Sequence, residues 1–287
     1  TFCSRGDKVL LHSPTYVGFT GSLKNNGYDI IHSALKQDEN GIWRMDFEDM
    51  EKKIVENKIH AAIFCSPHNP CGRVWEKWEV EQAMELYRKH DVMVVSDEIW
   101  SDIIRPGCKH VPTQSVSEDA KMRTIALYAP SKTFNIAGLA TSVTIIPDDE
   151  LRAKFNAECD RTHAGGGNIF GTTALEVAYN EGEEWLNEVM EYIAGNIDYV
   201  GKFLEENCPK IRHYEQQGTF LMWLDCREMG LEHEAMLDFW TNKARIGVNN
   251  GATFGEEGRG FVRMNIGTSR SVIEQAMAQL KEAYEKL

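Results

Sequence analysis

The sequence predicts an α/β protein: a mostly parallel sheet sandwiched by helices, with a smaller α+β domain after it. Two observations lead to this prediction. Five apolar runs bounded by turn residues are typical of buried parallel strands, and amphipathic helices lie between the first three of them. With 287 residues, the chain is long enough for one large domain and a smaller one.

The predicted strands and helices alternate through the first half of the chain. The apolar runs are KVLLHSP (8–14), HAAIFCSP (60–67), DVMVVSD (91–97), TIALYAP (124–130) and ATSVTIIP (140–147). DFEDMEKKIVENK separates the first two, and EKWEVEQAMELYRKH separates the second from the third. The apolar face of that second helix is formed by Val80, Ala83, Met84 and Tyr87. Such βαβ units place helices on both faces of a parallel sheet.

The pattern changes after about Asp149. A long amphipathic helix is predicted over residues 183–207, followed by two short strands in GTFLMWLD and GFVRMNIG. A final helix begins with a predicted capping box, Ser271 with Glu274 three residues later. We therefore expect a large cofactor-binding domain over residues 1–182 and a small C-terminal domain over residues 183–287.

Composition excludes several classes of partner. A formal net charge of −13 and a pI near 5.2 argue against binding to nucleic acid or to an anionic membrane surface. No apolar run approaches the roughly 18 residues that span a bilayer. The seven cysteines are scattered, with no CxxC pair and no cysteine–histidine spacing typical of zinc. We expect reduced thiols in a cytoplasmic protein and no metal.

Four side chains stand where strands end. Tyr16, Asn69, Asp97 and Lys132 each follow one of the first four predicted strands. In open parallel sheets, ligands bind outside the carboxyl ends of the strands. Each residue alone also has a structural explanation. Asn69 begins a good turn sequence, Asp97 is suited to cap a helix, and Lys132 is suited to form an ion pair with Asp97.

Together, these four side chains predict a narrower chemistry. An aldehyde cofactor on an electron-poor ring needs an amine for a Schiff base, which Lys132 supplies. A protonated ring nitrogen needs a buried carboxylate beside it, which Asp97 supplies. The Asn69 amide is a donor for a ring oxygen, and the Tyr16 ring is a plate for the ring face.

Four motifs carry a resemblance to a known family. SPHNPCGRVW, VVSDEIWSD, APSKTFNIAGL and FVRMNIG resemble the pyridoxal 5'-phosphate enzymes of fold type I, in the class I/II aminotransferase superfamily. HNPCGRVW, SDEI and SKTFNIAGL are most similar to the MalY/PatB-type cystathionine β-lyases, also called cysteine-S-conjugate β-lyases. The resemblance runs from about Gly6 to the C-terminus. It implies a small amino-acid substrate and, for a full-length protein, a homodimer.

The resemblance also implies a role for each matching residue. Lys132 would bind the cofactor covalently, Asp97 would hold its ring nitrogen, and Asn69 would bond the ring oxygen. Tyr16 would stack on the ring, and Ser131 would help to bind the phosphate. Arg263, in FVRMN, would hold the substrate α-carboxylate together with Asn69. A planar guanidinium suits that task because it binds a carboxylate bidentately.

The sequence departs from the family pattern at three places. Trp100 stands where many relatives have tyrosine or histidine, and Cys71 replaces a common threonine. Family members also have roughly a hundred further N-terminal residues, which is a typical size for such a domain part. Those residues include a glycine-rich phosphate loop. We expect the chain beginning at Thr1 to be a piece of a longer protein and, by itself, to bind the cofactor poorly or not at all. The glycine run HAGGGN (163–168) is expected to be a flexible connection.

Three functions remain open at this point. The resemblance favours carbon–sulfur β-elimination, in which cystathionine or a cysteine S-conjugate yields pyruvate, ammonia and a thiol. An amino-acid aminotransferase is the alternative, because it uses the same early residues. A noncatalytic, truncated relative is the alternative from another class. The intact set of Lys132, Asp97, Asn69 and Arg263 favours an enzyme.

Overall fold

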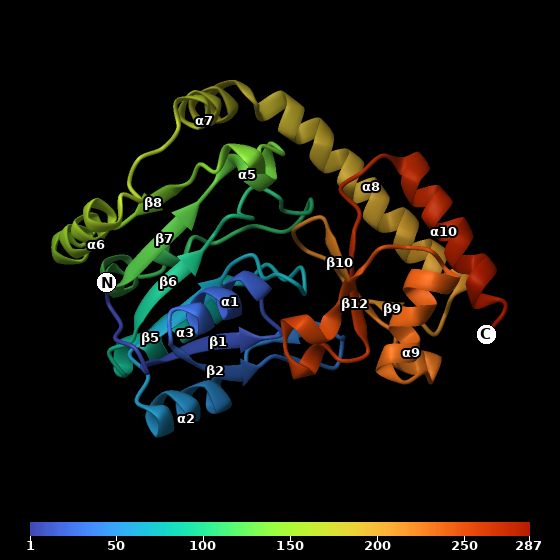
Figure 1. The fold of residues 1–287 in the computed structure, drawn as a ribbon, viewed down its shortest axis with the longest axis horizontal. Helices are drawn as coiled ribbons and strands as arrows, with labels where there is room; N and C mark the ends of the chain where they lie inside the picture. The colour runs from blue at the N-terminus through green and yellow to red at the C-terminus, as the bar shows by residue number, and fades with distance from the viewer.

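Two sheets organise the chain in the computed structural model, which describes residues 1–287 (Figure 1). A six-stranded sheet has the order β2-β1-β5-β6-β7-β8, and a four-stranded antiparallel sheet has the order β11-β12-β10-β9. A short antiparallel pair, β3-β4, stands apart from both. The strands are β1 (Lys8–Ser13), β2 (Asp29–Ala34), β3 (Lys36–Gln37), β4 (Trp43–Arg44), β5 (Ala61–Cys65), β6 (Met93–Asp97), β7 (Thr124–Tyr128), β8 (Val143–Ile145), β9 (Arg212–His213), β10 (Leu221–Asp225), β11 (Asn249–Asn250) and β12 (Phe261–Asn265).

Ten α-helices surround these sheets. They are α1 (Val17–Asn25), α2 (Phe47–Asn57), α3 (Lys77–Lys89), α4 (Glu118–Arg123), α5 (Pro130–Thr133), α6 (Asp149–Thr162), α7 (Ile169–Glu181), α8 (Glu183–Asn207), α9 (His233–Asp238) and α10 (Arg270–Tyr284). No helix in the structure combines the length and the apolar content that crossing a bilayer requires.

The large sheet is mostly parallel, as the sequence predicts. Strands β1, β5, β6 and β7 run parallel to one another. The prediction of a fifth buried parallel strand is wrong, because β8 pairs antiparallel with β7 and its three residues are partly or fully exposed. A parallel connection needs a crossover of a dozen or more residues, usually through a helix. Between β7 and β8 the only α-helix is α5, which has four residues and does not cross the sheet.

One strand of the large sheet, β2, is not among the predicted strands. β2 pairs parallel with β1 at the edge of the sheet, with Lys8 opposite Asp29. Its residues are mostly half-buried, and only Ser33 is fully buried. An edge strand with this exposure carries polar residues among its apolar ones, so DIIHSA does not stand out as a continuous apolar run.

The main core lies between one face of the large sheet and helices α2, α3 and α4. The predicted apolar face of α3 is confirmed, since Val80, Ala83, Met84 and Tyr87 are all buried. These side chains belong to one cluster with Leu10 of β1 and Phe64 of β5. On the opposite face, Leu23 of α1 packs against Val9 and Leu11. Burial of this core holds the strands in register, so that their carboxyl ends meet at one edge.

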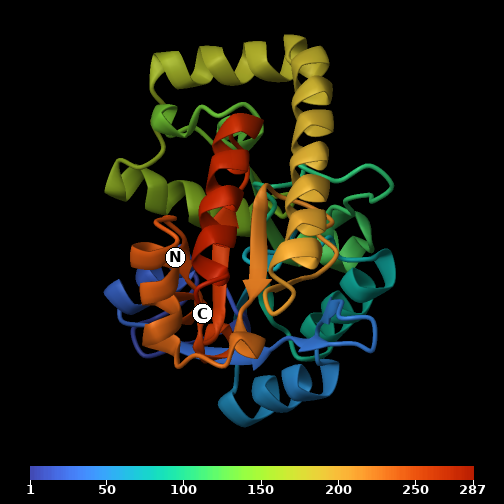
Figure 2. The same cartoon turned by 90° about the vertical axis from the view of Figure 1, so that its right-hand side faces the viewer.

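The small sheet has a core of its own. Helices α8 and α10 lie side by side against β10 and β12 (Figure 2), and their buried residues form a second cluster with those strands. Trp223, Phe254 and Phe261, however, pack into the core of the large sheet. The boundary at residue 183 stays a prediction. It coincides with the junction of α7 and α8, which only Gly182 separates.

The predicted capping box of α10 is wrong. The helix begins at Arg270, so Ser271 lies inside its first turn, and the preceding residue is Ser269. The Arg270 backbone N–H donates a hydrogen bond of 2.6 Å to the Tyr192 hydroxyl of α8. The hydroxyl of a tyrosine on the neighbouring helix therefore accepts a hydrogen bond from one of the N-terminal amides. A capping side chain would otherwise provide such an acceptor.

Candidate active site

A cavity of about 530 Å³ opens at the carboxyl ends of the parallel strands, against β10 and β12 of the small sheet. That size is typical of sites for small molecules. All six residues that the sequence singles out line this cavity, namely Tyr16, Asn69, Asp97, Ser131, Lys132 and Arg263. The rule that ligands bind at the carboxyl edge of a parallel sheet therefore identifies the region correctly.

Asp97 is a buried carboxylate at the wall of this cavity. It is the last residue of β6, its exposed fraction is 9%, and its Oδ1 accepts a hydrogen bond of 3.1 Å from the Ile99 backbone N–H. The pKa of this carboxyl is raised to about 6, chiefly by burial and in part by the charge of neighbouring Glu98, against the lowering effects of the Ile99 N–H and of Lys132. A carboxylate that is desolvated in this way favours a cationic partner.

Lys132 stands on α5, the single helical turn that follows β7. Pro130 occupies the first position of this turn, where its missing N–H costs no hydrogen bond. The Lys132 Nζ lies 5.8 Å from the centre of the Trp100 ring. It is near enough to lower the pKa of Asp97, but the two side chains form no ion pair within 4.0 Å. A structural ion pair therefore does not account for Lys132.

Arg263 enters the cavity from the small sheet. It occupies the middle of β12, and its Nη1 donates to the Asn69 Oδ1 at 2.7 Å, while its Nη2 donates to the Asn249 Oδ1 at 2.9 Å. Its guanidinium carbon lies 4.7 Å from the centre of the Phe254 ring. Burial lowers the pKa of Arg263. Both hydrogen-bond partners are neutral amides, so the guanidinium is oriented while its positive charge stays without a counterion.

The orientation of Asn69 follows from this contact. A guanidinium can only donate hydrogen bonds, so Asn69 must present its amide oxygen to Arg263. The amide nitrogen of Asn69 is then the group that can donate to a ligand in the cavity. The turn that carries Asn69 is held to the loop between β9 and β10 as well, because the Gly72 carbonyl accepts hydrogen bonds from the backbone N–H groups of Gln217 and Gly218 at 3.0 and 2.9 Å.

Three aromatic side chains, those of Tyr16, Trp100 and Phe220, line the cavity. Tyr16, just before α1, is 38% exposed and contacts Phe19 edge to face at 5.4 Å. Gly18 leaves room for the Tyr16 ring, because a Cβ there would clash with it. Trp100 is only 6% exposed and meets Phe220 edge to face at 4.8 Å. The ring that departs from the family pattern is therefore part of the cavity wall.

Several cavity residues were missed in the sequence. Asn265 follows Arg263 by two positions on β12, so the two side chains share a face of that strand, and this spacing could have identified it. Thr141 and Ser142 place hydroxyl groups in the lining, although no motif singled them out. The glycine run lies between α6 and α7, as predicted for a connection, and none of its residues lines the cavity.

Glu98 was also missed, although it follows Asp97 directly. It is fully buried, and its two carboxylate oxygens accept hydrogen bonds from the His110 ring at 2.7 Å, the Tyr128 hydroxyl at 2.8 Å and the Ser96 hydroxyl at 2.9 Å. These bonds fasten the end of β6 to β7 and to the following loop. Glu98 therefore helps to hold the strand end that carries Asp97.

Comparisons with known proteins give one consistent result. A family model described as aminotransferase class I and II matches residues 1–280. Cystathionine β-lyase PatB of Bacillus subtilis is 38% identical over 282 residues, which are 98% of this chain and 73% of PatB. Cystalysin of Treponema denticola, whose crystal structure contains pyridoxal 5'-phosphate, superposes with a TM-score of 0.96 at 37% identity, over 99% of this chain and 72% of cystalysin.

A third similar protein is a C–S lyase with bound pyridoxal phosphate. The pyridoxal-phosphate-bound C–S lyase of Staphylococcus hominis superposes with a TM-score of 0.91 at 31% identity, over 98% of this chain and 71% of that lyase. The parallel sheet, the position of the cavity and the extent of these matches agree. This chain belongs to the aminotransferase class I and II family.

Proposed function

We propose that this chain is a pyridoxal 5'-phosphate-dependent carbon–sulfur β-lyase that converts cystathionine or another cysteine S-conjugate to pyruvate, ammonia and a thiol. The observation that carries the proposal is the convergence of Lys132, Asp97 and Arg263 on one cavity. The 38% identity to a cystathionine β-lyase over 98% of the chain supports it. The substrate is thus a small amino acid.

The cavity residues fit this cofactor. Asp97 is a desolvated carboxylate without a cationic partner in the chain, and a pyridinium nitrogen would provide that partner. Lys132 provides the amine, the Asn69 amide nitrogen a donor for the ring oxygen, and Tyr16 an aromatic face. Ser131 provides a hydroxyl group for the phosphate. Pyridoxal phosphate, when bound, supplies an aldehyde that joins the substrate amine and a ring that withdraws electrons from the α-carbon.

The protein's own groups divide the remaining work. Arg263 holds the substrate α-carboxylate, and its hydrogen bond to Asn69 fixes the direction of the guanidinium. Lys132 Nζ takes the proton from the α-carbon. The carbon–sulfur bond then breaks with its electron pair leaving on sulfur, and water provides the carbonyl oxygen of pyruvate. No external oxidant or reductant is needed.

The second candidate is an amino-acid aminotransferase, which the description of the family model favours. Both reactions begin with binding at Arg263 and proton removal by Lys132. They diverge afterwards, because a lyase expels the β-substituent whereas an aminotransferase passes its amino group to a keto acid.

Given cystathionine or S-methylcysteine and no keto acid, the full-length enzyme is expected to release pyruvate, ammonia and a thiol in equal amounts. The physical requirement is a leaving group on the β-carbon once Lys132 has removed the α-proton. Pyruvate is measured with lactate dehydrogenase and thiol with a disulfide reagent. Alanine is the matched control, since it binds through the same carboxylate but lacks the leaving group. Pyruvate that appears only after a keto acid is added would make the aminotransferase the correct assignment.

Arg263→Lys is expected to lower kcat/KM by about 10- to 100-fold for every amino-acid substrate alike. A charged hydrogen bond contributes about 1.5–3 kcal/mol, and lysine cannot bind a carboxylate bidentately. Steady-state kinetics on two substrates with different side chains test this expectation. Arg259→Lys, an exposed arginine four residues earlier, is the control. A loss confined to one substrate would show that Arg263 contacts the side chain rather than the shared carboxylate.

We also propose that the full-length protein is a cytoplasmic homodimer. Ile169 and Phe170, at the start of α7, are 76% and 75% exposed, and apolar side chains this exposed are typical of a surface that a second copy covers. The seven cysteines form no disulfide, which suits a reducing compartment. Sedimentation velocity at micromolar concentration tests the assembly, and a monomer would contradict it.

A further inference from the structure

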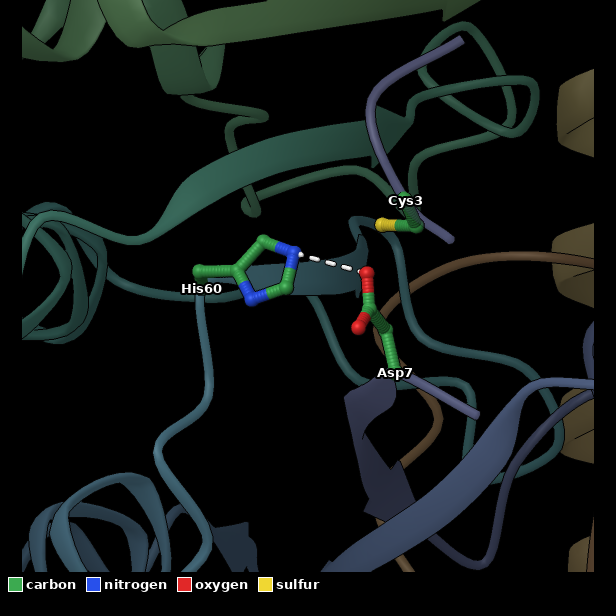
Figure 3. A group of neighbouring side chains, drawn as sticks. All are labelled: Cys3, Asp7 and His60. Carbon is green, nitrogen blue, oxygen red and sulfur yellow. Dashed lines mark ion pairs between the residues drawn. The ribbon is translucent and has the colours of Figure 1, made fainter. Parts of the chain in front are cut away.

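Three side chains with metal-binding atoms converge at the edge of the large sheet opposite the cavity. Cys3 lies before β1, Asp7 immediately precedes β1, and His60 immediately precedes β5. One ligand atom from each residue lies within 4.8 Å of the others. Figure 3 shows the Cys3 sulfur directed toward the imidazole–carboxylate pair of the other two residues.

The backbone holds two of these residues in place. β1 and β5 are parallel neighbours with Val9 opposite Ala61, so Asp7 and His60 lie at the same end of this strand pair. The Asp7 carbonyl accepts from Asp29 N–H at 2.9 Å, and the His60 carbonyl accepts from Met93 N–H at 2.9 Å. Both positions are thus part of the sheet's hydrogen-bonding pattern, and the ligand atoms do not depend on a mobile loop.

A turn brings Cys3 back over the same edge. The Asp7 N–H donates to the Ser4 carbonyl at 3.0 Å, and the Ser4 N–H donates to Asp7 Oδ2 at 2.6 Å. Cys3 itself is half-buried against the small apolar cluster of Val9 and Leu11. The turn and this packing place the sulfur beside a carboxylate oxygen that already faces the imidazole.

The spacing of the ligand atoms matches a tetrahedral zinc site. His60 Nε2 and Asp7 Oδ2 are 3.3 Å apart. With zinc–nitrogen and zinc–oxygen bonds of about 2.0–2.1 Å, two ligands of a tetrahedron are about 3.3–3.4 Å apart. The Cys3 sulfur lies within 4.8 Å of both atoms and is the ligand for a third corner, with a zinc–sulfur bond of about 2.3 Å.

The ligand types select the metal. Calcium and magnesium prefer sites made only of oxygen atoms, whereas a thiolate and an imidazole suit zinc. We propose that Cys3, Asp7 and His60 bind a zinc ion whose fourth position is open to water. The ion would hold residues 1–7 against the start of β5. This site lies at the edge of the large sheet opposite the cavity.

The test uses the full chain, reduced and freed of metal. Calorimetric titration with zinc chloride is expected to show one equivalent bound, and cobalt chloride is expected to produce a thiolate-to-cobalt charge-transfer band in difference spectra. Cys3→Ser should abolish the band. Cys3→Ser and His60→Gln should each weaken zinc binding at least about tenfold, because even loss of an outer-shell partner costs about 10- to 100-fold.

Two matched variants separate this site from other thiols and histidines. Cys108→Ser removes a half-buried cysteine elsewhere, and His90→Gln removes a histidine that pairs with Glu51 at 2.8 Å without a thiol nearby. Both should bind zinc as the unmodified chain does. Absence of the cobalt band in the unmodified chain overturns the proposal, whatever the variants do. Zinc affinity within twofold of the unmodified chain in folded Cys3→Ser and His60→Gln also overturns it.

Discussion

Lys132→Ala is expected to lower the rate of β-elimination by about three to four powers of ten or more. A positioned acid–base group alone contributes about 10²- to 10⁴-fold, and this variant also loses the covalent attachment of the cofactor. Borohydride reduction of the unmodified, cofactor-loaded protein, followed by peptide mapping, is expected to place the cofactor on Lys132. Turnover of the variant is followed as pyruvate release.

Lys121→Ala is the control for this experiment, because Lys121 lies exposed on α4, away from the cavity lining. It should keep full activity. Cofactor label on another lysine, or Lys132→Ala activity within tenfold of the unmodified enzyme, would exclude Lys132 from the reaction. A well-folded, unmodified full-length protein that takes up no label would instead support the noncatalytic relative.

Asp97→Ala is expected to lower kcat by about two to three and a half powers of ten. A buried cation that loses its partner is destabilised by about 3–5 kcal/mol, and each 1.4 kcal/mol in the barrier is tenfold in rate. Asp97→Asn separates charge from shape, since an amide keeps the size of the side chain and an oxygen that can accept from Ile99 N–H. Both variants should be slow. Activity of Asp97→Asn near that of the unmodified enzyme would mean that the charge is dispensable.

The same carboxyl group gives a second readout in the cofactor-free protein. Its pKa is raised from 3.8 to about 6 on folding. At pH values between these two, the carboxyl group is therefore protonated more often in the folded state than in the unfolded state. Stability from this group is therefore present below about pH 4 and is lost as pH rises through about 6, by about 3 kcal/mol in total. Urea unfolding at pH 4.5 and pH 7 should show about 2 kcal/mol of this decrease in the unmodified protein and a smaller decrease in Asp97→Asn.

The sequence predicts the elements that bury a continuous apolar run or an apolar helical face. β5 and β6 are buried along most of their length, and α3 presents a single apolar face, so periodicity identifies them. Periodicity does not identify the edge strand β2, because its residues are half-exposed. The apolar pattern does not predict the direction of β8, because strand direction depends on the path of the connection rather than on composition.

The site residues likewise divide into those that the local sequence pattern indicates and those that it does not. Asn69, Asp97 and Lys132 were predicted because each follows a parallel strand and parallel strands share an edge. Arg263 was identified only through the family resemblance, since nothing local in β12 indicates that it reaches Asn69, 194 residues away in the chain. Spacing in the sequence likewise does not indicate that Cys3 and His60 lie together, because sheet pairing, not sequence proximity, brings them together.

The hydrogen bond between Arg263 and Asn69 has a thermodynamic consequence. Arg263 belongs to the small sheet and, in the proposed function, would hold the substrate carboxylate, whereas Asn69 follows β5 and would contact the cofactor ring. Two ligands that act on the two ends of one bond are coupled, and coupling between binding sites is reciprocal. Whatever factor a bound carboxylate contributes to the affinity for pyridoxal phosphate, the cofactor must return to the affinity for the carboxylate. If Arg263 and Asn69 have these roles, substrate and cofactor are expected to bind cooperatively, coupled through the Asn69 amide.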